Sequence, residues 1–137
     1  MTNGPSWAQW ALGLAEAASE RSEDPYVKVG ACIIGFDNSV ASVGYNGVPS
    51  GISIDMSDRE RRRPYMVHAE ANALRYIKPG DGRLLAVTHM PCIECLKTAK
   101  AYDINEIVYS MTIDNSVYDT SAIMKMAFEF GMTVRSF

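Results

Sequence analysis

The alternation of apolar and polar residues predicts a helix and then a hairpin in the first third of the chain. Residues 9–18 are rich in Ala and Leu, which favour a helix, and Ser6 stands where an N-cap is expected. Two short apolar runs, at 29–36 and 40–45, flank a polar turn and predict two paired strands. The three glycines and the proline of residues 44–51 predict a loop after the second strand.

The rest of the chain alternates between helical and strand-like spacing. It begins with a polar stretch at 53–64 in which Arg59, Arg61, Arg62 and Arg63 crowd together. The elements predicted after it are a helix at 68–77, a strand at 84–88, a helix at 91–102 opened by Pro91, a strand at 104–109, a helix at 121–130 and a strand at 132–137. The order α-β-β followed by three α-β pairs predicts an α/β fold, with a mixed sheet and helices on its faces.

Length and composition indicate one globular domain over residues 1–137. The 137 residues are 47% hydrophobic and 21% charged, and a chain of this length buries a core without disulfide support. The formal net charge of -3 argues against a broad surface for duplex nucleic acid. Apolar runs fall short of the roughly 18 residues of a membrane span, and the first residues lack a signal-peptide pattern. We therefore expect a cytoplasmic protein without membrane contact.

Two short motifs hold the residue types of a metal site. The first is His-Ala-Glu at 68–70 and the second is Pro-Cys-Ile-Glu-Cys at 91–95, each at the start of a predicted helix. The segment between them, residues 71–90, is long enough for a helix, a turn and a strand. The two helix starts can therefore meet at one end of the sheet.

The donor types favour a catalytic zinc ion. Cys92 and Cys95 are three residues apart, which places both sulfurs on one helix face, and a helix start stabilises thiolates. With His68 they make three protein ligands, so the fourth position of a tetrahedral zinc stays open for water, whose pKa the metal lowers toward about 7. Glu70 is then the natural proton carrier. We expect His68 at the very start of its helix, where both side chains can aim inward.

Other interpretations of these residues stay open. A lone Cys-x-x-Cys is also typical of a thioredoxin-like redox pair, or of half a structural zinc site. His89, three residues before Cys92, could complete a four-ligand structural site. We expect it at the pocket rim instead, because a fourth protein ligand would remove the open position. Cys32 lies in an apolar strand and is expected in the core.

The chain resembles the deoxycytidylate deaminases of the cytidine deaminase-like superfamily. His-x-Glu followed by Pro-Cys-x-x-Cys is the signature of zinc nucleobase deaminases. The Gly-Tyr-Asn-Gly-Val-Pro loop at 44–49 resembles the family's own loop and is the discriminating piece, because the zinc motifs occur across the superfamily. Other similar stretches are 22–25, 29–33, 64–73 and 127–137. The resemblance implies a three-layer α/β/α fold with a five-stranded mixed sheet.

The resemblance also implies roles for individual residues in the hydrolysis of dCMP to dUMP. The residues that it assigns to zinc and to catalysis are His68, Cys92, Cys95 and Glu70. The Ala69 backbone would contact the base, Asn46 would bond the sugar or base, and Tyr118 would stack on the cytosine. Members are usually hexamers, activated by dCTP and inhibited by dTTP, often with Mg²⁺ at the effector phosphates. We therefore expect a homo-oligomer with nucleotide effectors.

Recognition of the nucleotide phosphate needs cations near the pocket. Lys28, just before the first predicted strand, and the arginines at 59–63 are the candidates in the sequence, although each is equally typical of a solvent-exposed charge. Two rival functions differ in what they require. Another deaminase would act on a free nucleoside, on guanine or on a tRNA adenosine, whereas a structural zinc module would use His89 as a fourth ligand and leave Glu70 idle.

Overall fold

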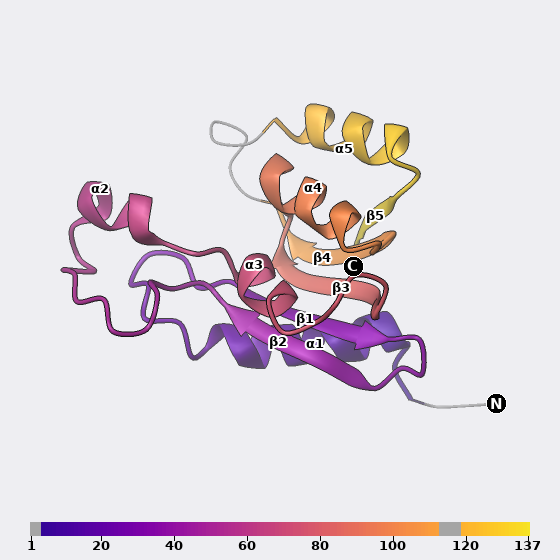
Figure 1. Ribbon diagram of the computed structural model, residues 1–137, viewed down its shortest axis with the longest axis horizontal. Coiled ribbons are helices and arrows are strands. Elements are labelled where there is room, and N and C mark those ends of the chain that lie inside the picture. The colour runs from indigo at the N-terminus through magenta and orange to yellow at the C-terminus, as the bar shows by residue number, and fades with distance from the viewer. Residues whose placement is uncertain (1–3, 113–118) are drawn as a thin grey trace.

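The computed structural model describes residues 4–112 and 119–137, which form a five-stranded sheet with helices on both faces (Figure 1). The strands are β1 (Gly30–Gly35), β2 (Val40–Tyr45), β3 (Gly82–His89), β4 (Glu106–Met111) and β5 (Thr133–Ser136). The helices are α1 (Trp7–Ser19), α2 (Arg59–Arg62), α3 (Ala69–Leu74), α4 (Ile93–Ala101) and α5 (Thr120–Glu129), with a 3-10 turn η1 (Arg63–Tyr65) after α2. None of the helices in these ranges is long and apolar enough to cross a membrane.

The sheet is mixed, as the sequence predicts. Its order is β2-β1-β3-β4-β5, in which β1 pairs antiparallel with both of its neighbours while β3, β4 and β5 run parallel. The hairpin of β1 and β2 therefore forms an antiparallel edge on a sheet whose other three strands are parallel. The expected α/β/α fold with a five-stranded mixed sheet is confirmed.

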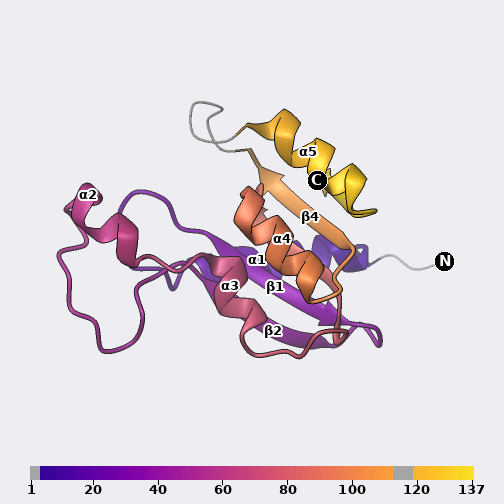
Figure 2. The same cartoon turned by 45° about the horizontal axis from the view of Figure 1, so that its top comes forward.

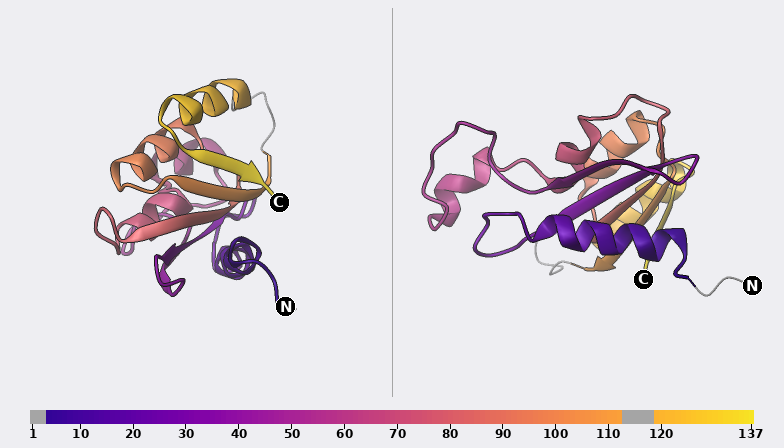
Figure 3. Two further views of the ribbon diagram at one scale, coloured as in Figure 1. Left: turned by 90° about the vertical axis from the view of Figure 1, so that its right-hand side faces the viewer. Right: turned by 90° about the horizontal axis from the view of Figure 1, so that it is seen from below.

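Each face of the sheet has its own hydrophobic cluster. On one face α1 packs across β1, β2 and β3 through alanines, and Cys32 lies fully buried there, as expected (Figure 3). On the other face α3, α4 and α5 lie side by side over the sheet (Figure 2). Ile33, Leu85 and Ile107 point to that face from three neighbouring strands, which is the period-2 alternation of a sheet covered on both sides.

Three local expectations are wrong in detail. Pro91 does not open α4, because Cys92 is the N-cap and the helix begins at Ile93. The helix expected at 68–77 ends at Leu74, and its continuation tightens into i→i−3 bonds, with the Ile77 N–H bonded to the Leu74 carbonyl. The polar stretch at 53–64 holds a short helix, α2, which the sequence did not predict.

The packing of β2 against α3 fixes where the first motif stands. A Cβ atom on Gly44 would lie 2.5 Å from the Ala73 nitrogen and 2.6 Å from the Ala69 carbonyl oxygen. Only glycine permits this approach of the strand backbone to the helix backbone. The first glycine of the Gly-Tyr-Asn-Gly loop is therefore needed to bring α3 onto the sheet.

Candidate active site

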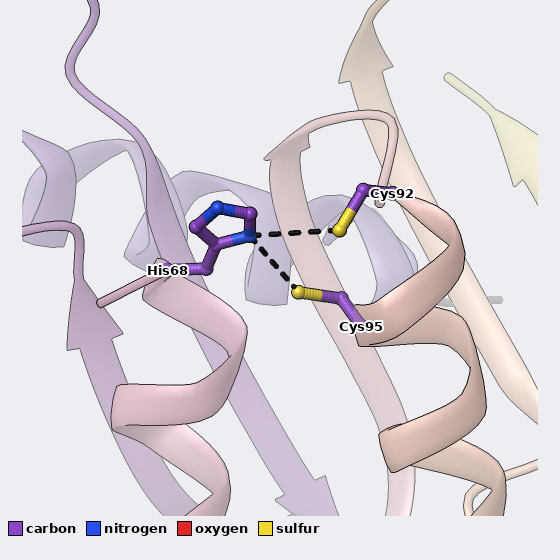
Figure 4. A group of neighbouring side chains, drawn as sticks. All are labelled: His68, Cys92 and Cys95. Carbon is purple, nitrogen blue, oxygen red and sulfur yellow. Dashed lines mark hydrogen bonds between the residues drawn. The ribbon is translucent and has the colours of Figure 1, made fainter. Parts of the chain in front are cut away.

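Two helix starts converge at one end of the sheet and bring three metal-binding side chains together. His68 is the N-cap of α3, with φ -67° and ψ 152°, and Cys92 is the N-cap of α4. Cys95 lies in the first turn of α4. The Nδ1 atom of His68 lies 3.3 Å from the Cys95 sulfur and 3.5 Å from the Cys92 sulfur, as the dashed lines in Figure 4 show. The expected position of His68 at the start of its helix is confirmed.

The donor atoms have the spacing of a tetrahedral zinc site. Zinc–nitrogen and zinc–sulfur bonds of usual length, at a tetrahedral angle, would separate a nitrogen from a sulfur by about 3.6 Å. The two distances from His68 Nδ1 agree with this, and the donor atoms of all three residues lie within 4.8 Å of one another. Within residues 4–112 and 119–137 the metal-binding group consists of these three residues alone. Three donors leave one position of a tetrahedral ion open.

The two thiols compete for ionisation because they lie side by side. The pKa of Cys92 is lowered to about 4, first by a hydrogen bond from Cys95 and then by the contact with His68. Burial acts in the opposite direction and raises it. The same contact with Cys92, together with burial, raises the pKa of Cys95. A divalent cation between them would end this competition, since its charge stabilises both thiolates.

Glu70 stands beside these ligands in a buried position. It lies in the first turn of α3 and its exposed fraction is 4%. Burial is the largest cause that raises its pKa above the ordinary value, while its own backbone N–H and the charge of His68 act in the opposite direction. A carboxyl group whose pKa is raised toward neutrality can both take up and release a proton near pH 7. The site thus places a buried carboxyl group with a raised pKa beside three side chains that could hold a metal ion.

A pocket of about 350 Å³ opens above the ligands. His68, Ala69, Glu70 and Cys92 form its floor, so Ala69 borders the same space as two of the three possible ligands. Its apolar wall consists of Val27, Val29, Met66 and Met90, and its polar wall includes Asp24, Asn46, His89, Arg59, Arg62 and Arg63. The size and the mixture of apolar and polar walls suit a small molecule.

One residue expected in this pocket, Lys28, lies elsewhere. Lys28 is exposed and is not among the described residues that line the pocket. Tyr118, the expected stacking residue, lies outside the described residues.

His89 lies at the pocket wall, as expected. The Thr88 hydroxyl accepts the Gly30 N–H at 3.1 Å and lies 2.8 Å from Nδ1 of His89. Because Thr88 is buried and its proton needs an acceptor, Nδ1 accepts it and Nε2 carries the ring proton. Burial lowers the pKa of His89, which favours the same neutral form. His89 therefore faces the pocket as a neutral hydrogen-bond donor.

Asn46 is buried and its side-chain amide is engaged with the protein. Its Oδ1 atom accepts the Val29 N–H at 2.9 Å, and its Nδ2 atom donates to the Val27 carbonyl at 2.9 Å and to Asp24 at 3.4 Å. Its backbone carbonyl accepts the Ser22 hydroxyl at 2.8 Å. In this arrangement one lone pair of Oδ1 is left for a ligand.

The arginine cluster is divided in a way that sequence patterns did not reveal. Arg59, Arg61 and Arg63 are exposed, whereas Arg62 is buried and forms an ion pair with Asp24 at 2.8 Å. Asp24 lies in the Ser-Glu-Asp-Pro stretch, whose Asp-Pro pair is a turn signal but carries no sign of a charged partner 38 residues away. Nothing in the sequence distinguishes Arg62 from its neighbours.

Comparison with known proteins decides which kind of metal site this is. A family model for the cytidine and deoxycytidylate deaminase zinc-binding region matches residues 5–111. The chain belongs to this deaminase family. The family expected from the sequence is therefore confirmed, and the chain is a zinc-dependent deaminase.

Similar proteins include mammalian and viral members of the family. Deoxycytidylate deaminase of Mus musculus is 31% identical over 141 residues, which cover 96% of this chain and 79% of that one. The human deoxycytidylate deaminase is 32% identical with the same coverage. Among solved structures, the dCMP deaminase of the cyanophage S-TIM5 in complex with dCMP and dUMP aligns with a TM-score of 0.82 and 26% identity, covering 99% of this deaminase and 100% of that chain.

Proposed function

We propose that this deaminase hydrolyses the amino group of dCMP to give dUMP and ammonia. The observation that carries the proposal is the group of His68, Cys92 and Cys95, beside buried Glu70, at a pocket that Arg59, Arg62 and Arg63 also line. The similarity to mouse and human deoxycytidylate deaminases, and to a phage enzyme solved with dCMP and dUMP, supports the same substrate.

In this proposal His68, Cys92 and Cys95 hold Zn²⁺. When bound, zinc lowers the pKa of a water molecule and so supplies the nucleophile at neutral pH. Glu70 takes up the proton that the attacking water loses and delivers it to the ring nitrogen of cytosine. It then takes the remaining proton from the newly added hydroxyl and transfers it to the departing amine, so that the carbonyl of uracil forms as ammonia leaves. Burial favours this role, because it raises the pKa of Glu70 above its ordinary value and so makes the carboxylate a better proton acceptor.

The base and sugar are held by residues around that floor. We assign to the backbone of Ala69 a contact with the base, since it lines the pocket between His68 and Glu70. Asn46 lines the same pocket and offers the free lone pair of Oδ1 to a sugar hydroxyl. A stacking role for Tyr118 rests on the family resemblance.

The phosphate is recognised by the arginine-rich wall. Arg59 and Arg63 are exposed and line the pocket, so their guanidinium groups are free to meet an anion. Arg62 lines it too, but its charge is paired with Asp24. Lys28, the other candidate from the sequence, would need to approach from outside the pocket. We therefore rank it after Arg59 and Arg63 as a phosphate-binding residue.

We further propose that the chain is a homo-oligomer, hexameric as family members usually are, with dCTP as activator and dTTP as inhibitor and Mg²⁺ at the effector phosphates. Exposed aromatic residues support association between copies, with Trp7 52% and Phe128 86% exposed. Light scattering tests the assembly, and dCMP turnover with added dCTP or dTTP tests the regulation.

A substrate panel tests the proposed function. The zinc-loaded enzyme is incubated with dCMP, CMP, deoxycytidine and an adenosine-containing RNA, and the products are identified by mass. We expect conversion of dCMP to dUMP to be the fastest reaction. Preferred conversion of the free nucleoside or of the RNA would assign a different deaminase, and the absence of any product would favour a structural zinc module.

A further inference from the structure

Arg62 is buried, although nothing in the sequence sets it apart from the exposed arginines beside it. Its side chain is 7% exposed and its partner Asp24 is 5% exposed. Its Nη1 atom donates to Asp24 Oδ2 at 2.8 Å, while its Nε atom has no hydrogen-bond partner in residues 4–112 and 119–137. A buried ion pair with an unpaired nitrogen is weak support for stability, because apolar residues of similar volume often do as well. Its geometry points to another role.

The carboxylate of Asp24 ties this arginine to the loop before β1. Its Oδ1 atom accepts the backbone N–H groups of Tyr26 at 2.7 Å and of Val27 at 3.1 Å. The Tyr26 ring then lies under the guanidinium groups of both Arg62 and Arg59, each 4.9 Å from the ring centroid. The Tyr26 hydroxyl donates to the Ser57 carbonyl at 2.7 Å. Several contacts thus fix the segment that carries α2 against one short loop.

The same network reaches the metal-binding end of the sheet. Asn46 contacts Asp24 through its side chain, and its neighbour Gly47 pairs with Val67 through two backbone hydrogen bonds of 2.8 and 3.1 Å. Val67 immediately precedes His68. The ion pair therefore lies where α2, the loop at Asn46 and the residues before α3 come together.

We propose that Arg62 is a positioning residue for substrate selectivity. Its ion pair with Asp24 holds α2 so that Arg59 and Arg63 face the pocket before the substrate arrives. The inference rests on the proposed function, in which these two arginines recognise the phosphate. Preorganised groups bind more tightly because their conformational entropy is already lost before the ligand binds. Loss of the ion pair should therefore lower kcat/KM for dCMP more than kcat/KM for deoxycytidine, which has no phosphate.

The test replaces both charges, because removing one alone would leave the other buried and unpaired. The double variant Asp24→Asn with Arg62→Met keeps an acceptor for the Tyr26 and Val27 N–H groups. We expect it to fold and to lose about tenfold more kcat/KM for dCMP than for deoxycytidine, with the excess loss appearing as a higher KM for dCMP. The matched control is Arg61→Met, which removes an exposed arginine of the same helix and should leave both substrates unchanged.

A second variant tests the ion pair itself. Arg62→Lys keeps a cation for Asp24 and should retain most of the preference for dCMP. If its kcat/KM for dCMP is as low as that of the double variant, the mechanism is overturned. Equal losses on both substrates in the double variant, or no loss on dCMP, would also overturn it. If the unsubstituted enzyme shows no preference for dCMP, the proposed function fails as well. If that preference exists and the double variant keeps it, this inference fails alone.

Discussion

The Nδ1 atom of His68 lies 3.3 Å from the Sγ atom of Cys95, although 27 residues separate the two along the chain. The sheet order brings them together, because the chain passes from α3 through β3 into α4 and both helices begin at the same end of the sheet. The donors are therefore positioned by the fold.

Metal content separates the open site from a four-ligand site. We expect His89→Ala to keep the zinc content of the unsubstituted enzyme, because Nδ1 of His89 accepts the Thr88 hydroxyl and the ring stands outside the three-ligand group. Cys92→Ala should lose zinc, since two protein ligands remain. Metal analysis of the purified variants provides the comparison. Equal zinc loss in the two variants would mean that His89 is a ligand.

Replacing Glu70 by Gln should abolish turnover and leave the fold intact. The amide has the volume of the carboxyl group but cannot carry a proton, and one group serves several proton transfers here. General acid–base catalysis contributes about 10² to 10⁴ in rate, so we expect a loss at the upper end of this range. Zinc content and the thermal midpoint are measured on the same sample. If turnover stays within about tenfold of the original, Glu70 is not the proton carrier.

Alkylation should distinguish Cys92 from Cys32. Burial raises the pKa of the Cys32 thiol to about 11, so at about pH 8 it stays protonated and unreactive in the folded chain. Cys92, whose pKa is lowered to about 4, is a thiolate at that pH and is shielded only by bound metal. We expect iodoacetamide to label Cys92 after chelation and Cys32 only after unfolding, as read by peptide mass spectrometry. Labelling of Cys32 in the native enzyme would contradict its place in the core.

Asn46→Ala should destabilise the fold as well as weaken dCMP turnover. It leaves the part-buried Val29 N–H and Val27 carbonyl without their partners, at a cost of about 1 kcal/mol for each group. Urea unfolding of the zinc-loaded enzyme measures the loss. The exposed Asn105→Ala, which removes only a surface contact with Lys100, is the control. Lower dCMP turnover with unchanged stability would show that Asn46 acts on the substrate alone.

The convergence of His68, Cys92 and Cys95 could be predicted from the sequence because each belongs to a short local motif. His68 and Cys92 each stand at a helix start, and the segment between them is just long enough to bring the two starts together. The exact start of α4 was missed, because Pro91 also fits the residue before an N-cap, and Cys92 fills that cap without a side-chain hydrogen bond. The order of elements was sufficient to predict a mixed sheet.

The polar network could not be predicted in the same way. Arg62 and Asp24 are 38 residues apart, and only the tertiary fold decides which of four crowded arginines turns inward. Asn46 was expected to face the substrate, yet the amide that would do so also holds the backbone of Val27 and Val29. Partners of this kind depend on the path of two loops, which carry no periodic signal.

The ratio of kcat/KM for dCMP to kcat/KM for deoxycytidine tests the central claim most directly. The two substrates present the same base and sugar to the pocket floor that would hold zinc. They differ in the phosphate, which Arg59 and Arg63 of the pocket wall would bind. A charge-assisted contact contributes about 1.5–3 kcal/mol, so we expect a ratio of at least about ten for the zinc-loaded enzyme. A ratio near one would reduce the protein to a general cytosine deaminase and contradict the nucleotide assignment.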